Sequence, residues 1–492
     1  MLETGLVLLF KALIINIFVP LLAGWGCMRL CFGDRLQWIK LHIVSWFLGI
    51  GLIANWMFDL QFVRFGVGIW EYLLLLVLLA IGVLIRVHKG GLSRSSIINS
   101  LKIQKISWIK ASYQSLAKWE KVVTMGWTIF VAWFLVNSFI HGINFPTYAD
   151  DAFGNRHKPA TNIYHDGGVK MIGQTGEALG RARLWYPIHV PIYKAVVSDF
   201  MWWWYDIYSD MFQRLGLLFI LIFSYVLTFE KTKNALHSII PAALMCGLPL
   251  VFWHAIDGYH ELPSVYYSII AIWFLYEYLE TEHIDNLILG SFFLWFLSYV
   301  KNDGFVIYMP GIALGFVITI LLKWQLQHIR KQVISSKKAI GLIVGGIVLF
   351  LLPFLWLKQY YDLGFNQAQW DASGVGIDST VHREIFSQFK WLFFQENNYN
   401  IILVIVGLML FMWYILIDRK QPKRNPIFPI VASIVIFALF TAAFLFTENY
   451  KFVMDQTTVN RTYTAAFMIL CFYFWICYEA YHSVTATTPK NK

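Results

Sequence analysis

Residues 141–155 read HGINFPTYADDAFGN and open a polar stretch that extends to about Arg214. The stretch carries His157, His165, Asp166, Lys170 and Arg181, and residues 185–191 near its end read WYPIHVP. Long hydrophobic runs flank it on both sides. A loop of this length between hydrophobic segments is usually either functional or disordered, and its many aromatic residues argue against disorder. We therefore expect a folded loop that holds a functional site, with the rest of the chain as its scaffold.

The composition excludes a water-soluble globular protein. Hydrophobic residues make up 58% of the chain and charged residues only 14%, whereas soluble domains average about 25% charged residues. The 22 Trp and 25 Tyr residues suit the two membrane–water interfaces, where an apolar ring with a polar group is favoured. The sequence thus predicts an all-α polytopic membrane protein.

We predict about 13 membrane-spanning helices from segments of roughly 17–25 apolar residues. They cover residues 5–27, 41–60, 67–86, 122–141, 213–229, 238–254, 262–280, 286–300, 304–322, 339–357, 399–417, 426–446 and 463–482. Residues 188–206 are only moderately apolar and contain Lys194, Asp199 and Asp206. We expect this segment to form an interfacial helix on the membrane surface, because a further span there would invert every later loop.

The net charge of +10 is distributed as the positive-inside rule requires and does not indicate nucleic-acid binding. Basic residues concentrate in the segments 87–121, 323–338 and 418–424, which we place in the cytoplasm together with the C-terminus. The loops 142–212, 358–398 and 447–462 then lie outside, with the short turns 257–263 and 301–304. The N-terminus lacks the basic start and the cleavage site of a signal peptide. An uncleaved N-terminus fits a protein of the prokaryotic plasma (inner) membrane, and the endoplasmic reticulum is the alternative location.

Carboxylates in the external segments are candidate catalytic groups. Asp150 and Asp151 follow a predicted span end and could provide a general base that takes a proton from an acceptor hydroxyl. With Glu261 they could also hold Mg²⁺ or Mn²⁺, although no metal or other cofactor is firmly indicated. Asp257 and Glu261 form a second acidic site in the turn 257–263. The alternative for Asp150 and Asp151 is a solvated pair that caps a helix.

Cations near the same predicted face could bind a lipid phosphate. Arg461 could hold a phosphate through two hydrogen bonds; the alternative is an interfacial anchor. Lys301 lies two residues from Asp303, and a local ion pair between them is the alternative there. Lys194, His189 and Tyr186 complete the candidate donor-phosphate site. The histidines show no spacing typical of a zinc site.

Several motifs in the same order resemble the GT-C superfold, the integral-membrane glycosyltransferases that use polyprenyl-phosphate sugars. The likeness is to the dolichyl-phosphate-mannose-protein mannosyltransferase and aminoarabinose transferase type, and it is strongest over about 122–310. The motifs are 148–155 (YADDAFGN), 186–191 (YPIHVP), 257–263 (DGYHELP), 300–304 (VKNDG) and 459–461 (VNR). The resemblance implies a catalytic acid in the first large external loop, here Asp150 or Asp151, and an acid in the next external turn, here Asp257 or Glu261.

The resemblance also divides the chain into three parts. Residues 1–121 are a three-span N-terminal addition with the basic cytoplasmic segment. Residues 122–322 are the GT-C-like catalytic core with the external loop 142–212, and residues 323–492 hold the C-terminal spans with the loops 358–398 and 447–462. The chain departs from the family where residues 188–190 separate Pro187 from Pro191.

We therefore expect an inverting glycosyltransferase that moves a sugar from a polyprenyl-phosphate donor to a lipid, glycan or protein acceptor at the extracytoplasmic face. Its partners would be these substrates and membrane lipids. A transporter or flippase of a lipid-linked or polar substrate is the main alternative, and it would place charges or helix breaks in mid-membrane. A structural membrane protein, or a glycan polymerase or ligase that uses a similar donor, remains a further alternative.

Overall fold

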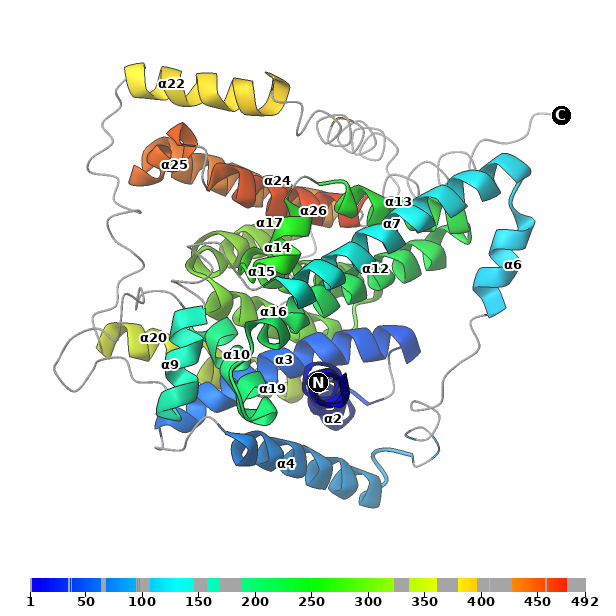
Figure 1. Cartoon of the computed structure of the whole chain (residues 1–492), viewed down its shortest axis with the longest axis vertical. Coiled ribbons are helices and arrows are strands. Elements are labelled where there is room, and N and C mark those ends of the chain that lie inside the picture. Colours follow the sequence, from blue (N-terminus) through cyan, green and yellow to red (C-terminus); the bar gives the residue numbers. More distant parts are fainter. Residues whose placement is uncertain are drawn as a thin grey trace.

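The computed structural model describes residues 2–33, 36, 38–62, 68–93, 95, 97, 107–145, 157–168, 187–248, 250–322, 336–360, 379–395, 407, 427–455 and 458–475. Every regular element within these ranges is a helix (Figure 1). Eight of these helices are long and apolar enough to cross a membrane. The prediction of an all-helical, multi-pass membrane chain is therefore confirmed, whereas the number of about 13 spans is not.

The N-terminal helices follow the predicted spans closely. The first predicted span is one helical rod with a π-helical turn at Ile14–Phe18, and the next two predicted spans also form single helices. The bounds are α1 (Leu2–Leu13), α2 (Val19–Cys31), α3 (Trp38–Phe62), α4 (Ile69–His88), α6 (Ser107–Ser115) and α7 (Lys118–Asn144).

The central helices differ from the prediction in two places. The predicted span 238–254 is broken between Gly247 and Leu250, so that α13 and α14 replace one continuous helix. The described residues of the loop 142–212 also form three helices, α9, α10 and α11. The bounds are α9 (Lys158–Asp166), α10 (His189–Met201), α11 (Asp206–Ser209), α12 (Met211–Thr232), α13 (Ala235–Cys246), α14 (Val251–Ile256), α15 (Glu261–Thr281) and α16 (Ile284–Val300).

The C-terminal part contains further helices in the predicted spans. The predicted span 399–417 lies outside the described residues except for Gly407. The last described helix begins four residues before the predicted span 463–482. The bounds are α17 (Met309–Leu322, preceded by a π-helical turn at Gly304–Tyr308), α19 (Lys337–Gly346), α20 (Leu352–Tyr360), α22 (Ser379–Lys390), α24 (Ile427–Phe446), α25 (Lys451–Met454) and α26 (Val459–Phe472).

Close backbone contacts join the N-terminal helices to the rest of the molecule. A Cβ atom added at Gly24 of α2 would lie 1.7 Å from the carbonyl oxygen of Ser45 on α3, so only glycine permits this crossing. On α3, a Cβ at Gly51 would lie 2.5 Å from the ring of Phe296 on α16. Small residues at helix crossings are typical of membrane proteins, whose helices associate mainly through close packing. One hydrophobic core consequently runs from α1 to α26.

A helix forms within the predicted segment 188–206, but α10 ends at Met201 and is buried among other helices instead of exposing a polar face. Its side chains from His189 to Ser198 are all buried, including Lys194 at 0% exposure. The helix packs against α1, α3, α9 and α16. Because Lys194 has a buried carboxylate partner, it does not need to reach the membrane surface.

The helices α7 and α12 connect two differently charged ends of the molecule. At one end, Lys40 of α3 pairs with Glu230 of α12 at 2.8 Å, and α6 contacts the α12–α13 turn through a hydrogen bond from Ser112 Oγ to the carbonyl oxygen of Lys233. We call this the basic end, because Lys110 of α6, Lys118 of α7 and Lys233 after α12 lie there. At the opposite end, Gly142 of α7 packs directly against the guanidinium of Arg214. A helix as long as α12 spans about 33 Å, so the two ends lie a bilayer thickness apart.

Candidate functional site

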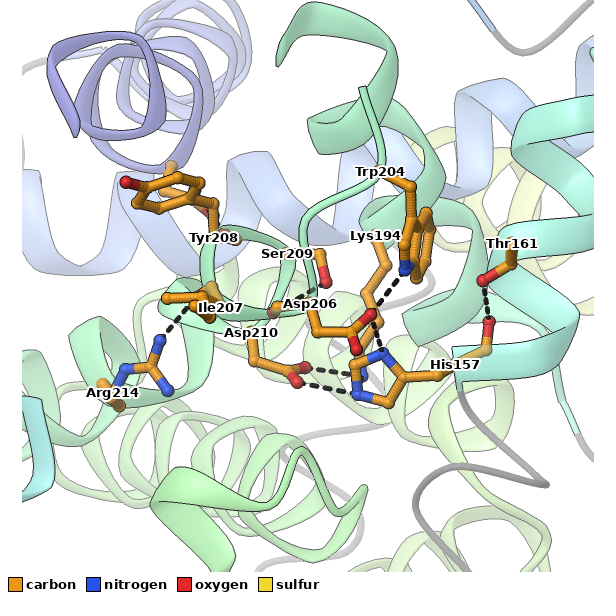
Figure 2. Close-up of polar contacts among 11 residues, drawn as sticks. His157, Thr161, Lys194, Trp204, Asp206, Ile207, Tyr208, Ser209, Asp210 and Arg214 are labelled. Atoms are coloured by element: carbon orange, nitrogen blue, oxygen red, sulfur yellow. Dashed lines mark hydrogen bonds and ion pairs between the residues drawn. The ribbon is translucent and has the colours of Figure 1, made fainter. Parts of the chain in front are cut away.

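Four ionisable side chains form a buried ion cluster at the start of α12 (Figure 2). His157 Nε2 lies 2.8 Å from Asp210 Oδ2, and His157 Nδ1 lies 3.2 Å from Asp206 Oδ1. Lys194 Nζ lies 2.5 Å from Asp210 Oδ1. The cluster therefore joins the residue that precedes α9 to the middle of α10 and to the starts of α11 and α12.

Local structure fixes the two carboxylates of this cluster. Asp206 begins α11 and accepts a hydrogen bond from the indole Nε1 of Trp204. Asp210 comes one helical turn later and immediately precedes α12. Residues four apart on consecutive helical turns point in similar directions, so both carboxylates face His157.

The charges of the buried ion cluster balance when His157 is protonated. Burial alone lowers the pKa of His157, and Lys194 opposes protonation too, but Asp210 and Asp206 outweigh both and raise the pKa above its ordinary value. Two carboxylates, one ammonium and one imidazolium then sum to zero. The buried guanidinium of Arg214 adds a further positive charge that also interacts with Asp210. Buried charges are tolerated when they are paired in this way.

The turn 257–260 packs against the buried ion cluster at Asp210. Gly258 has a φ of +73°, and a Cβ atom there would lie 2.8 Å from Asp210 Oδ2. The neighbouring Asp257 is buried, and burial together with the charge of Asp210 raises its pKa to about 6. A carboxyl group with such a pKa exchanges protons near neutral pH, which is what a general acid or base requires.

A second ion cluster begins where this turn ends. Lys301 Nζ lies 3.1 Å from Glu261 Oε1 and 2.6 Å from Asp303 Oδ2. Lys301 and Glu261 are both buried. The local pair of Lys301 with Asp303 is therefore present, but Lys301 also joins the first residue of α15 to the end of α16.

Two more cations lie at the ends of neighbouring helices. The guanidinium of Arg461, on α26, stacks 4.9 Å from the ring centroid of Tyr259. Lys358, in the last turn of α20, donates a hydrogen bond of 3.3 Å to the Oδ1 of buried Asn302. The turn 257–261 thus receives a cationic side chain from α26, and the turn 301–303 receives one from α20.

His254 lies among these groups. Its ring is 5.4 Å from that of Tyr259, and it interacts electrostatically with Glu261, Arg461 and Lys301. Its Nε2 is buried and has no hydrogen-bond partner within the described residues. A buried nitrogen without a partner is costly unless a ligand or water satisfies it.

The structure brings some of the predicted site residues together and places others elsewhere. Asp150, Asp151 and Tyr186 lie outside the described residues. Asp257, Glu261, Lys301 and Arg461 gather around the turn 257–261, and Lys194 lies in the adjoining buried ion cluster. His189 differs, because its Nε2 contacts the hydroxyl of Tyr267 at 3.1 Å in an aromatic environment.

Several residues that the structure brings to this region were not predicted from the sequence as site residues. They are His157, Asp206, Asp210, His254 and Lys358. One signal was available, since Asp206 and Asp210 are spaced by four residues directly before a predicted span. Among the described residues, no group of three or more His, Cys, Asp or Glu side chains could hold a metal ion. Comparisons with protein families, characterised proteins and solved structures found no match for this chain.

Proposed function

We propose that this protein is a membrane glycosyltransferase that moves a sugar from a polyprenyl-phosphate donor to an acceptor hydroxyl at the extracytoplasmic face. The observation that supports this most is the gathering of Lys301 and Arg461 at the carboxylate-bearing turn 257–261, with Lys358 bound to Asn302 beside Lys301. Ionisable groups in a membrane protein are costly and usually mark a functional site. Cations beside a titratable carboxylate suit chemistry on a phosphate-bearing lipid.

The cations would act on the leaving group. As the bond between the anomeric carbon and the phosphate oxygen breaks, its electron pair passes to that oxygen and negative charge grows on the phosphate. Positive groups already fixed at that position stabilise the transition state more than the ground state. Arg461 offers a planar pair of donors for phosphate oxygens, and His254 Nε2 could donate a further hydrogen bond when protonated at that nitrogen.

A carboxylate would receive the proton. The acceptor oxygen attacks the anomeric carbon on the face opposite the phosphate, which inverts the configuration, and the hydroxyl proton passes to the base. Asp150 or Asp151 is the base that the family resemblance implies. Asp257 is the candidate with a suitable environment among the described residues, because its pKa is raised to about 6.

A divalent cation is an open part of this proposal. Mg²⁺ and Mn²⁺ prefer carboxylate oxygens, which Asp150, Asp151 and Glu261 could offer. Glu261 already contacts Lys301 at 3.1 Å, so a metal ion there would compete with the lysine ammonium. We favour neutralisation of the phosphate by protein cations, and chelation with EDTA tests this choice.

The test follows turnover of radiolabelled polyprenyl-phosphate sugars by the purified protein in lipid, with and without EDTA. We expect loss of sugar from the donor in the wild type and a fall of at least about 100-fold in the variant that removes the base, Asp150→Asn, Asp151→Asn or Asp257→Asn. Arg461→Gln should lower turnover as well, while Lys337→Gln at the start of α19 serves as a control. Wild-type transfer in all three aspartate variants would refute the mechanism.

A transporter or flippase is the second candidate, and the buried ion cluster favours it. Chains of buried Asp, Lys and His side chains often carry protons in transporters. In sealed vesicles, such a protein would move lipid-linked substrate across the bilayer without consuming it, and Asp210→Asn would abolish that movement. Movement without sugar transfer for every donor would replace the glycosyltransferase proposal.

A further inference from the structure

A large apolar cavity lies away from the candidate site, near the basic end. It has a volume of about 780 Å³ and is bounded by α6, α7, α12, α13 and the start of α3. Ligand cavities typically measure about 300–1,000 Å³. The lining is almost entirely hydrocarbon, with Leu218 and Leu221 on α12 and Ile239 on α13 as examples.

The cavity opens sideways between α7 and α12. Met125 and Ile129 on α7 line it and are 52% and 60% exposed, and Ile222 on α12 is 39% exposed. Both helices belong to the candidate membrane spans. The surface outside this opening is therefore lipid, and hydrocarbon chains can enter without crossing water.

The helix α6 closes the cavity at the basic end. Ser112 Oγ donates to the carbonyl oxygen of Lys233 and accepts from the backbone amide of Ala235 at 3.1 Å. Leu116 packs with Ala235 and Leu236 beside Tyr113. Lys110 and Tyr113 of α6 contribute to the cavity wall, so the closed end carries an exposed ammonium and a phenol.

The charges around this end favour an anion. Lys110 lies on α6, Lys118 begins α7, and Lys233 directly follows α12. The nearby acids are engaged, because Glu230 pairs with Lys40 and Glu120 accepts a hydrogen bond from the backbone amide of Ala117. Basic residues beside a membrane attract anionic lipid headgroups.

One polar atom in the wall lacks a partner. Thr124 lines the cavity, is 5% exposed, and its Oγ1 has no hydrogen-bond partner within the described part of the chain. An unsatisfied buried hydroxyl costs about 1–3 kcal/mol. Because this oxygen is itself buried, a bound molecule with an oxygen near the headgroup level would satisfy it after the Thr124 side chain rotates toward the cavity.

We propose that this cavity binds one anionic phospholipid from the leaflet at the basic end. An acyl chain fills the apolar space between α7, α12 and α13, an ester oxygen meets the hydroxyl of Thr124, and the phosphate faces Lys110. This site is separate from the proposed glycosyl transfer, because α6 and the turn 257–261 lie at opposite ends of α7 and α12.

The test measures lipid binding by native mass spectrometry of the delipidated full-length protein. Dioleoyl phosphatidylglycerol is added in one series and dioleoyl phosphatidylcholine in another. We expect one tightly held phosphatidylglycerol and weaker phosphatidylcholine binding. Lys110→Gln should weaken phosphatidylglycerol binding about fivefold, while the control Lys337→Gln, which removes an exposed lysine on α19, leaves it unchanged. Equal binding of the two lipids would overturn the proposal.

A second variant and a labelling experiment test the position of the chain. Ala242→Phe places a ring in the cavity and should abolish the bound lipid, with unchanged thermal unfolding as the check that the protein folds. Phosphatidylglycerol with a diazirine on its acyl chain should label peptides from 124–135 and 218–226. A retained lipid in a folded Ala242→Phe protein, or labelling confined to other helices, would refute the assignment.

Discussion

Removing one charge from the buried ion cluster should destabilise the protein strongly. Asp210→Asn keeps the side-chain shape but leaves Lys194, which is 0% exposed, without its carboxylate at 2.5 Å. It also removes the carboxylate 2.8 Å from His157 Nε2. Breaking a buried ion pair on one side costs about 3–5 kcal/mol, because the remaining charge stays buried after losing its carboxylate partner.

The assay is reversible unfolding in mixed detergent micelles, followed by tryptophan fluorescence. We expect Asp210→Asn to lower the free energy of unfolding by about 3–5 kcal/mol. The matched control is Glu230→Gln, which removes one partner of the pair with Lys40. That pair has a similar length of 2.8 Å but is 13% and 25% exposed, so its loss should cost at most about 1 kcal/mol.

A double variant distinguishes the effect of an unpaired charge from the effect of lost packing. Lys194→Met combined with Asp210→Leu removes both charges and retains much of the volume, so it should be more stable than Asp210→Asn alone. If Asp210→Asn costs no more than Glu230→Gln, or if the double variant is the least stable of all, the cluster does not hold the buried charges inferred here.

The remaining predictions concern the turn 257–260 and its surroundings. If Asp257 is the base, turnover should rise with pH and level off above about 6, because only the carboxylate accepts a proton, and Asp257→Asn should remove this dependence. Gly258→Ala should cost more stability than Gly167→Ala. Both glycines have positive φ, but a Cβ at Gly258 meets Asp210 whereas nothing described lies within 4 Å at Gly167. Arg461→Lys should lower turnover while retaining charge, since lysine lacks the planar donor pair. The stabilisation from protonated His157 should be complete below about pH 6.5 and be lost as pH rises through its raised pKa, and His157→Gln should remove this part of the pH dependence of unfolding.

Helix positions could be predicted because membrane helices depend on local composition. A run of about 20 apolar residues must satisfy its own backbone hydrogen bonds in lipid, and the bounds of α15 differ from the predicted span 262–280 by only one residue at each end. The break between α13 and α14 was harder to predict. Residues 238–254 are mostly apolar, so hydrophobicity alone does not show the break, although Gly247 and Pro249 within them are residues that commonly end a helix.

The ion pairs could not be predicted, because they depend on contacts between distant residues. His157 and Asp210 are separated by 53 positions, and no local pattern pairs them. The burial of α10 could not be predicted for the same reason. Lys194 indicated a polar helix face in the sequence, and only its partner Asp210, which belongs to another helix, makes full burial possible. By contrast, Glu261 and Lys301 were recognised individually as site candidates, but their mutual contact was not.

The contacts of Gly142 and His157 have a consequence for the segment between them, which carries Asp150 and Asp151. Gly142 packs on Arg214 and His157 pairs with Asp210, so both ends of this segment are attached to the same first turn of α12. Bringing two distant positions of a chain together costs conformational entropy, and at residues 142 and 157 buried contacts with α12 offset that cost before any substrate binds. A substitution at either contact would therefore weaken the attachment of residue 142 or 157 to α12 without altering a proposed reacting group.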